Sequence, residues 1–426
     1  MAGGRKSIAG VLISLGVRGA GSGITLLTSV VLVRMLGGDL AGYVLLATTA
    51  VMMAAAIGRC GLEMVVLKAA AATPIDDVAN EGPSAYRRSR LVAGAASLAI
   101  AVAVLLLAEP IALHVLRKPP MAACLRAIAP AMLLMPLAMI AARALQGYRA
   151  INSSLFVLNC NTNLLFLAML VAVRPQTPER CCLLFAVATA VNYALGSLLL
   201  RSRRAGGRGE LTWEALRTMA VPNWIGVVVE TLVRLAGPLI AGAYCTPLEV
   251  TQMSVSQRLA MVVTIALTAA TYHAAPELAA AYRQEDHAKL KRVTQRAARW
   301  SCLLAFPVLL PMLIVPGWVL SIYGADVAEG ATLLRIMAAG QIINVMTGPV
   351  GNLLKLCDLE RQMRNATIAA GAWAVFGGWL LTWQFGAIGA AVSTATAVSG
   401  LMLLAAQAAS RHLGFHPIAV LLERPA

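Results

Sequence analysis

The chain has 426 residues, of which 59% are hydrophobic and only 13% are charged. Soluble proteins carry about 25% charged residues, and the apolar residues here form runs of about 20, long enough to cross a roughly 30 Å hydrocarbon core as helix. Backbone polar groups must be satisfied inside lipid, and the alternating pattern of a membrane β-barrel is missing. The composition therefore excludes a soluble globular domain and predicts an all-α integral membrane protein.

Hydropathy and helix-breaking residues predict twelve membrane spans in two six-helix lobes, 1–205 and 206–426. In chain order the spans of the N-terminal lobe are 8–36, 40–67, 91–116, 121–147, 150–173 and 181–200. Those of the C-terminal lobe are 215–242, 248–275, 298–323, 327–355, 363–383 and 386–409. The first apolar stretch continues to Leu36, far longer than the apolar region of a secretory signal peptide, so this helix is expected to stay in the mature protein.

The basic residues predict the orientation of these helices. The net charge is +16, and most of the 35 lysine and arginine residues fall on one side, in the termini and in the loops around 87–90, 201–208 and 283–299. By the positive-inside rule that side is cytoplasmic, which places both termini on the cytoplasmic side of the membrane. The basic loops are short and lack interleaved aromatic residues, so no nucleic-acid partner is expected.

The second half of the chain echoes the first. Pro110 matches Pro316, and the pair Leu125–Arg126 matches Leu334–Arg335, each pair lying near the start of the fourth span of its lobe. Because six is an even number, the two lobes would share one orientation and be related by a pseudo-two-fold axis along the membrane normal, which is a transporter architecture. The alternative is that apolar segments resemble one another through composition alone.

Three stretches carry a family resemblance. They are "LVRMLGGDLAGYVLL" (32–46), "SVSQRLAMVVTIALTAATYHAAPELAAAY" (254–282) and "FGAIGAAVSTATAVSG" (385–400). With the twelve-helix plan, their order and spacing resemble the multidrug/oligosaccharidyl-lipid/polysaccharide (MOP) exporter superfamily. The chain is most similar to the flippases of O-antigen and exopolysaccharide synthesis and, more distantly, to the lipid II flippase. The resemblance implies transport of a lipid-linked oligosaccharide across the bacterial cytoplasmic membrane by alternating access of two lobes.

Charged residues inside the predicted spans identify candidate site residues. A charge at the bilayer centre costs at least about 2.5–3.5 kcal/mol, so it normally faces a cavity or a partner. All four intramembrane arginines lie on the first two helices of a lobe, and arginine suits an anionic diphosphate because its planar fork donates paired hydrogen bonds. The predicted substrate-binding residues are Arg18, Arg59, Arg234, Arg258 and Asn223, and the predicted charge-pairing or coupling residues are Glu63 and Glu230.

Structural roles for the same residues remain open at this stage. The pairs Arg59–Glu63 and Glu230–Arg234 are each one helical turn apart and could neutralise themselves. Arg18 and Arg258 could reach the membrane surface by snorkelling. Polar stripes on the first and fifth helices, which include Asn152, Asn159 and Asn163 on the fifth, could serve interhelical hydrogen bonding alone.

Two other function classes compete with a flippase. A cation-coupled multidrug exporter of the same superfamily should carry an acid in the core of its first helix, and residues 8–36 contain none. A membrane glycosyltransferase or polymerase should show paired carboxylates or a sizeable outer loop, and neither is predicted. There is no Walker A motif or metal-ligand cluster in a span, so no enzyme activity, metal or cofactor is expected.

The expected partners are the lipid-linked oligosaccharide, membrane lipids and, as an open possibility, polysaccharide biosynthesis enzymes. The eight cysteines are interpreted as small apolar packing residues.

Overall fold

The computed structural model describes residues 2–71, 84–201, 214 and 216–418, and every regular element in these ranges is helical. They form two compact units. One comprises 1–231 with 246–248, and the other comprises 232–245 with 249–426. The predicted lobe boundary at 205/206 lies outside the described residues and stays a prediction.

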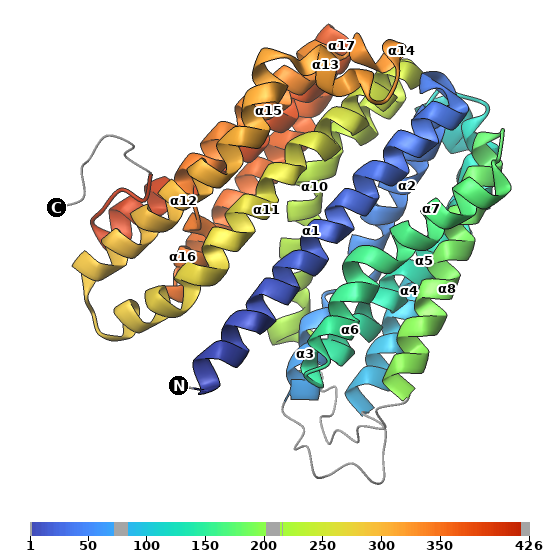
Figure 1. The fold of residues 1–426 in the computed structure, drawn as a ribbon. Coiled ribbons are helices and arrows are strands. Elements are labelled where there is room, and N and C mark those ends of the chain that lie inside the picture. The colour runs from blue at the N-terminus through green and yellow to red at the C-terminus, as the bar shows by residue number, and fades with distance from the viewer. Residues whose placement is uncertain (1, 72–83, 202–213, 215, 419–426) are drawn as a thin grey trace. The chain divides into compact units, whose positions relative to one another are not determined.

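The first unit is built around α5 (Met121–Gly147), the helix that the others contact most (Figure 1). It packs against α2 (Gly38–Gly58), α3 (Leu62–Ala71), α4 (Ser84–Pro110) and α8 (Pro178–Arg201). Along the other side, α1 (Ala2–Leu36) packs against α7 (Asn161–Val173). Short pieces complete the unit: η1 (Ile111–Val115), α6 (Ile151–Leu155), η2 (Phe156–Cys160) and η3 (Leu216–Ala220), of which the three η elements are π-helical.

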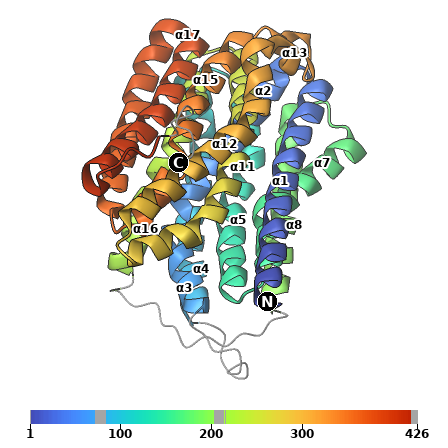
Figure 2. The same ribbon diagram turned by 60° about the vertical axis from the view of Figure 1, so that its left-hand side comes forward.

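The second unit consists mainly of long helices. It contains the later part of α10 (Val221–Tyr244), then α11 (Pro247–Arg283), α12 (His287–Ile314) and α15 (Ala331–Thr347). α17 (Glu360–Leu413) packs against α15 and against α16 (Val350–Leu356). The short helices α13 (Pro316–Ser321) and α14 (Ala325–Ala328) connect α12 to α15 (Figure 2).

The prediction of an all-α membrane protein is confirmed. Eleven segments among the described residues are long and apolar enough to cross a membrane. The last of them, α17, holds both of the final two predicted spans, because its backbone leaves helical geometry at Gly386 (φ +57°). The chain reverses there, since Trp373 Nε1 in one arm donates to Thr396 Oγ1 in the other at 2.9 Å.

Three predicted spans are interrupted. The second, expected over 40–67, breaks into α2 and α3 at the sequence Arg59–Cys60–Gly61, where Cys60 and Gly61 adopt φ values of +48° and +67°. The ninth, expected over 298–323, begins eleven residues earlier at His287 and stops at Ile314, before Pro316 opens α13. The tenth, expected over 327–355, breaks between α15 and α16 at Gly348, which adopts φ +60°. Hydropathy misses the first break because apolar residues continue on both sides of it.

The Leu-Arg pairs matched in the internal repeat occupy similar places in the two units. Leu125 and Leu334 are both buried in their units. Arg126 pairs with Glu109 at the end of α4 (Nη2–Oε2 2.9 Å), and the Nε of Arg335 donates to the carbonyl of Leu313 at the end of α12 (3.1 Å). In each unit, therefore, an arginine near the start of the fourth span holds the end of the third.

Gly389 should be essential for the reversal within α17. A Cβ at this position would lie 1.9 Å from the Leu381 carbonyl oxygen, whereas one on Gly400 of the same arm meets nothing within 4 Å. We expect Gly389→Ala to lower the free energy of unfolding by about 1–3 kcal/mol, as overpacking does. Gly400→Ala should be neutral or stabilising, because alanine favours helix over glycine. Denaturant titration of both variants in the same detergent measures the difference, and equal stabilities would contradict the tight turn.

Candidate functional site

The predicted arginines lie at two depths along their helices. Arg18 is about 27 Å from the end of α1 at Leu36, and Arg59 is about 31 Å from the start of α2 at Gly38, at 1.5 Å per residue. Because a hydrocarbon core is about 30 Å thick, both lie near the ends of their spans on the side of the basic loops. The side chain of Arg18 lies outside the described residues.

Arg234 and Arg258 lie deeper, and the structure brings their backbones together. Arg234 is about 15 Å from the end of α10 at Tyr244, and Arg258 is about 16 Å from the start of α11 at Pro247. The amide nitrogen of Gln257 donates to the backbone carbonyl of Arg234, which ties the two helices at this level. Both arginines are therefore placed at the middle of a span.

The side chains at this level are accessible to different degrees. Arg234 is exposed, as is Glu230 one turn before it, and Arg258 is half-buried. The buried Tyr323 is an electrostatic neighbour of Arg258. A charged side chain in the middle of a span is expensive against lipid, so this surface of α10 and α11 is suited to a water-filled space.

Arg59 and Glu63 form an ion pair across the break between α2 and α3. Arg59 Nη1 lies 2.6 Å from Glu63 Oε2, and the two side chains are only 12% and 7% exposed. Arg59 Nε also donates to the Ala55 carbonyl at 3.0 Å. The alternative of a locally neutralised pair thus has direct geometric support, whereas a substrate contact for Arg59 stays a prediction.

Asn223 and Trp224, at the start of α10, donate hydrogen bonds to backbone carbonyls at the same break. Asn223 Nδ2 donates to the Gly61 carbonyl at 3.1 Å, and Trp224 Nε1 donates to the Ile57 carbonyl at 2.9 Å. A Cβ on Gly61 would lie 2.0 Å from the carbonyl oxygen of Ala220, so only glycine allows this approach. The Ile57 carbonyl also accepts from the backbone nitrogen of Cys60 at 3.1 Å, so the side chains of Asn223 and Trp224 add to the hydrogen bonds of this turn and fasten the start of α10 to it. The amide nitrogen of Asn223, predicted to bind substrate, is thus engaged in a structural contact.

The polar stripes of the first and fifth spans meet each other. Asn163 Nδ2 donates to Thr25 Oγ1 at 2.8 Å, and Thr28 Oγ1 donates to the Asn163 carbonyl at 3.3 Å. A Cβ on Gly21 would lie 2.7 Å from the Asn159 carbonyl oxygen, which shows how closely α1 and η2 approach. Interhelical hydrogen bonding therefore accounts for these stripe residues.

Asn192 on α8 was not singled out by the sequence, yet it is the centre of a buried network. Its amide nitrogen donates to the Val157 carbonyl in η2 at 3.1 Å and to Thr162 Oγ1 at 2.8 Å. Its oxygen accepts from Asn161 Nδ2 at 2.7 Å. A π-helical turn disrupts the regular hydrogen-bond ladder, and Asn192 stabilises it. A single asparagine in an apolar helix was the only sequence signal.

Removing the Glu63 carboxylate should lower the free energy of unfolding much more than removing one partner of an exposed ion pair. Glu63→Gln leaves Arg59 as a buried, uncompensated charge, so the free energy of unfolding should fall by about 3 kcal/mol. The double variant Arg59→Met/Glu63→Leu should recover most of that loss. The control is Arg126→Gln, whose pair is 54% and 64% exposed and should cost less than about 1 kcal/mol. Equal losses for Glu63→Gln and Arg126→Gln in denaturant titration would contradict a buried pair.

Comparison with known proteins identifies the fold. No protein-family model and no curated protein matches the sequence. Among solved structures, an inward-facing multidrug resistance MATE family transporter of the MOP superfamily matches with a TM-score of 0.67 and 13% identity, over 93% of this chain and 95% of that one. Lipid II flippase MurJ in an inward closed conformation matches with a TM-score of 0.70 and 10% identity, over 90% of this chain and 84% of that one.

A third match is the MATE multidrug transporter DinF-BH, with a TM-score of 0.62, 12% identity and 94% of each chain covered. At such identities the likeness concerns the fold. The chain is a multi-pass membrane protein with the two-lobe, twelve-helix fold of MOP-superfamily transporters.

Proposed function

We propose that this protein moves a lipid-diphosphate-linked oligosaccharide across the bacterial cytoplasmic membrane by alternating access, for the synthesis of a cell-surface polysaccharide. The observation that carries the proposal is that Arg234 and Arg258 both lie at the middle of their spans, at a level where Gln257 of α11 donates to the backbone carbonyl of Arg234. Lipid does not stabilise such charges, whereas a passing anion does.

The charge balance at this level favours an anionic cargo. Arg234 and Arg258 outnumber Glu230, the acidic residue one turn away on α10. A guanidinium remains charged in a membrane and offers a planar fork of donors that matches phosphate oxygens. Two such groups are suited to a diphosphate, which presents several oxygens on two phosphorus centres.

The two depths suggest an order of contacts. Under the predicted orientation, the diphosphate approaches from the cytoplasmic leaflet and meets Arg18 first, near the start of its span. Arg234 and Arg258 lie at a greater depth along their own helices, so the diphosphate reaches that depth later. Arg59 takes a lesser part, because Glu63 and the Ala55 carbonyl already engage its guanidinium.

Removing these arginines should reduce transport without unfolding the chain. Loss of a charge-assisted contact of about 1.5–3 kcal/mol predicts a fall of at least about tenfold in glycan export for Arg234→Ala and Arg258→Ala. Arg18→Ala should lower export in the same direction. Export is measured in a strain that lacks the gene and is complemented with each variant. Arg126→Ala, which removes an exposed arginine from an ion pair, is the matched control and should export normally.

Normal export by Arg18→Ala and Arg234→Ala at wild-type protein levels would show that these residues do not bind the cargo. Transport of labelled lipid-linked diphosphate into proteoliposomes then distinguishes a wrong site from a wrong substrate. Wild-type protein that leaves this lipid in one leaflet would overturn the proposed function itself.

Cation-coupled multidrug export is the second candidate, and the MATE multidrug transporters among the structural matches favour it. The sequence of α1 speaks against it, because the helix contains arginine and no acidic residue that could hold a coupling cation. We expect expression of the chain in a drug-sensitive strain to leave growth in cationic dyes unchanged. Growth protection that is lost on dissipating the sodium or proton gradient would instead favour the exporter.

A further inference from the structure

α12 carries one stripe that changes from cationic to apolar along its length. Steps of three and four residues keep its members on one face of a helix. The cationic part consists of Lys289, Arg292, Arg296 and Arg299. The apolar part consists of Trp300, Leu303, Phe306, Leu310 and Ile314. Trp300, Leu303 and Phe306 are 56%, 62% and 57% exposed, and Arg292 and Arg296 are exposed as well.

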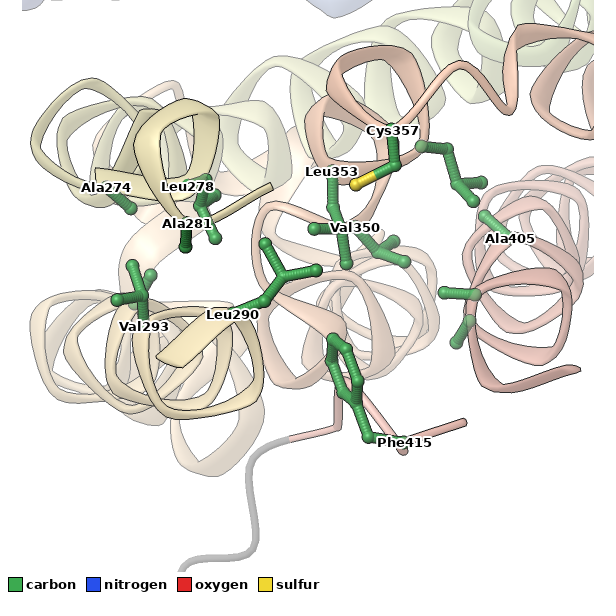
Figure 3. Close-up of a cluster of buried hydrophobic side chains, with 14 residues drawn as sticks. Ala274, Leu278, Ala281, Leu290, Val293, Val350, Leu353, Cys357, Ala405 and Phe415 are labelled. Carbon is green, nitrogen blue, oxygen red and sulfur yellow. The ribbon is translucent and has the colours of Figure 1, made fainter. Parts of the chain in front are cut away.

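A neighbouring face of α12 is fixed by packing within its unit. Leu290, Val293 and Ala297 are buried in a cluster with Leu278 of α11 and Leu353 of α16 (Figure 3). This cluster continues to the end of α17 and to Phe415. Because the cluster fixes the rotation of α12, the cationic stripe is held outward as a rigid row.

The join between Arg299 and Trp300 indicates where the stripe meets the membrane surface. Tryptophan is enriched at the boundary between hydrocarbon and headgroups, and exposed Leu303 and Phe306 follow it into the span. Headgroups occupy about 5–8 Å on each side of the core, and Arg296 lies about 6 Å before Trp300 at 1.5 Å per residue. Arg296 and Arg299 are thus at headgroup depth, with Arg292 and Lys289 further out.

We propose that this stripe, centred on Arg292, Arg296 and Arg299, is a binding site for the headgroups of anionic phospholipids. Charge complementarity and continuity with the lipid-facing apolar residues of the same helix both support this occupant. A basic cluster next to a membrane span attracts anionic lipid by about 1 kcal/mol per residue. The site is remote from the mid-span arginines and does not depend on the proposed cargo.

Acidic groups near the stripe leave it cationic. Glu277 of α11 forms an exposed ion pair with Arg296, and Asp286 caps the start of α12 by accepting from the Lys289 backbone. An exposed pair is weak, so a phosphate can share or replace the carboxylate of Glu277 at Arg296. Arg299 is half-buried, so its contact with a headgroup would be made through the accessible part of its guanidinium.

The test titrates fluorescently labelled phosphatidylglycerol or phosphatidylcholine into the purified full chain in a neutral detergent. We expect wild type to prefer phosphatidylglycerol and to lose that preference as salt is raised. The variant Arg292→Gln/Arg296→Gln/Arg299→Gln should bind phosphatidylglycerol at least about tenfold more weakly, with phosphatidylcholine binding unchanged. Should that variant fail to fold, Arg292→Gln/Arg296→Gln removes only exposed side chains and should show a smaller loss in the same direction.

The matched control is Arg361→Gln/Arg364→Gln/Arg411→Gln, which removes the same charge from exposed positions at the two ends of α17. It should change binding less than about twofold if the α12 stripe is the site. Equal losses in both triple variants, or no preference of wild type for phosphatidylglycerol, would overturn the proposal. Displacement of the labelled lipid by inorganic phosphate, at an ionic strength at which sodium chloride does not displace it, would also overturn the proposal.

Discussion

The constraint on which this structure depends is that polar groups within a membrane must find their partners inside the chain. The fold leaves regular helix at several points, and side chains from other helices donate to backbone carbonyls there. Asn223 and Trp224 serve the break after α2, and Asn192 serves the π-helical turn η2. The ion pair Arg59–Glu63 follows the same logic, since each charge would be costly alone. Irregular backbone is thereby made compatible with a lipid environment.

The sequence predicts the parts of the fold that hydropathy and strong helix breakers record. The all-α class, most spans and the reversal at Gly386 follow from them, because long apolar runs and a glycine between them have few other solutions in lipid. The break at Cys60–Gly61 was missed, since it lies within continuous apolar sequence and depends on Ala220 approaching Gly61 from a distant segment. Asn192 escaped notice for a similar reason: its role exists only where η2 exposes the Val157 carbonyl.

The sequence predicted which residues could form the candidate site, but it did not predict how they are arranged in space. Helical spacing indicated that Arg59 and Glu63 could pair, and they do pair, but the break at Cys60–Gly61 lies between them, so the contact depends on the turn and not on a continuous helix. Spacing could not divide the arginines into two depths, because that division needs the observed ends of α1, α2, α10 and α11. Nor could it tie Arg234 to α11, since the hydrogen bond from Gln257 joins residues on different helices.

α10 has a mechanical consequence for a protein of this fold. Asn223 and Trp224 fasten its first turns to one unit, whereas Val233 and Ala236 are buried in the core of the other. One continuous helix therefore belongs to both units, with the change at Thr231–Leu232. Thr231 donates to the Val227 carbonyl at 2.7 Å, a side-chain contact that often accompanies bending of a helix. The two units therefore share one helix, and the bending stiffness of α10 enters the energy of any motion that curves it.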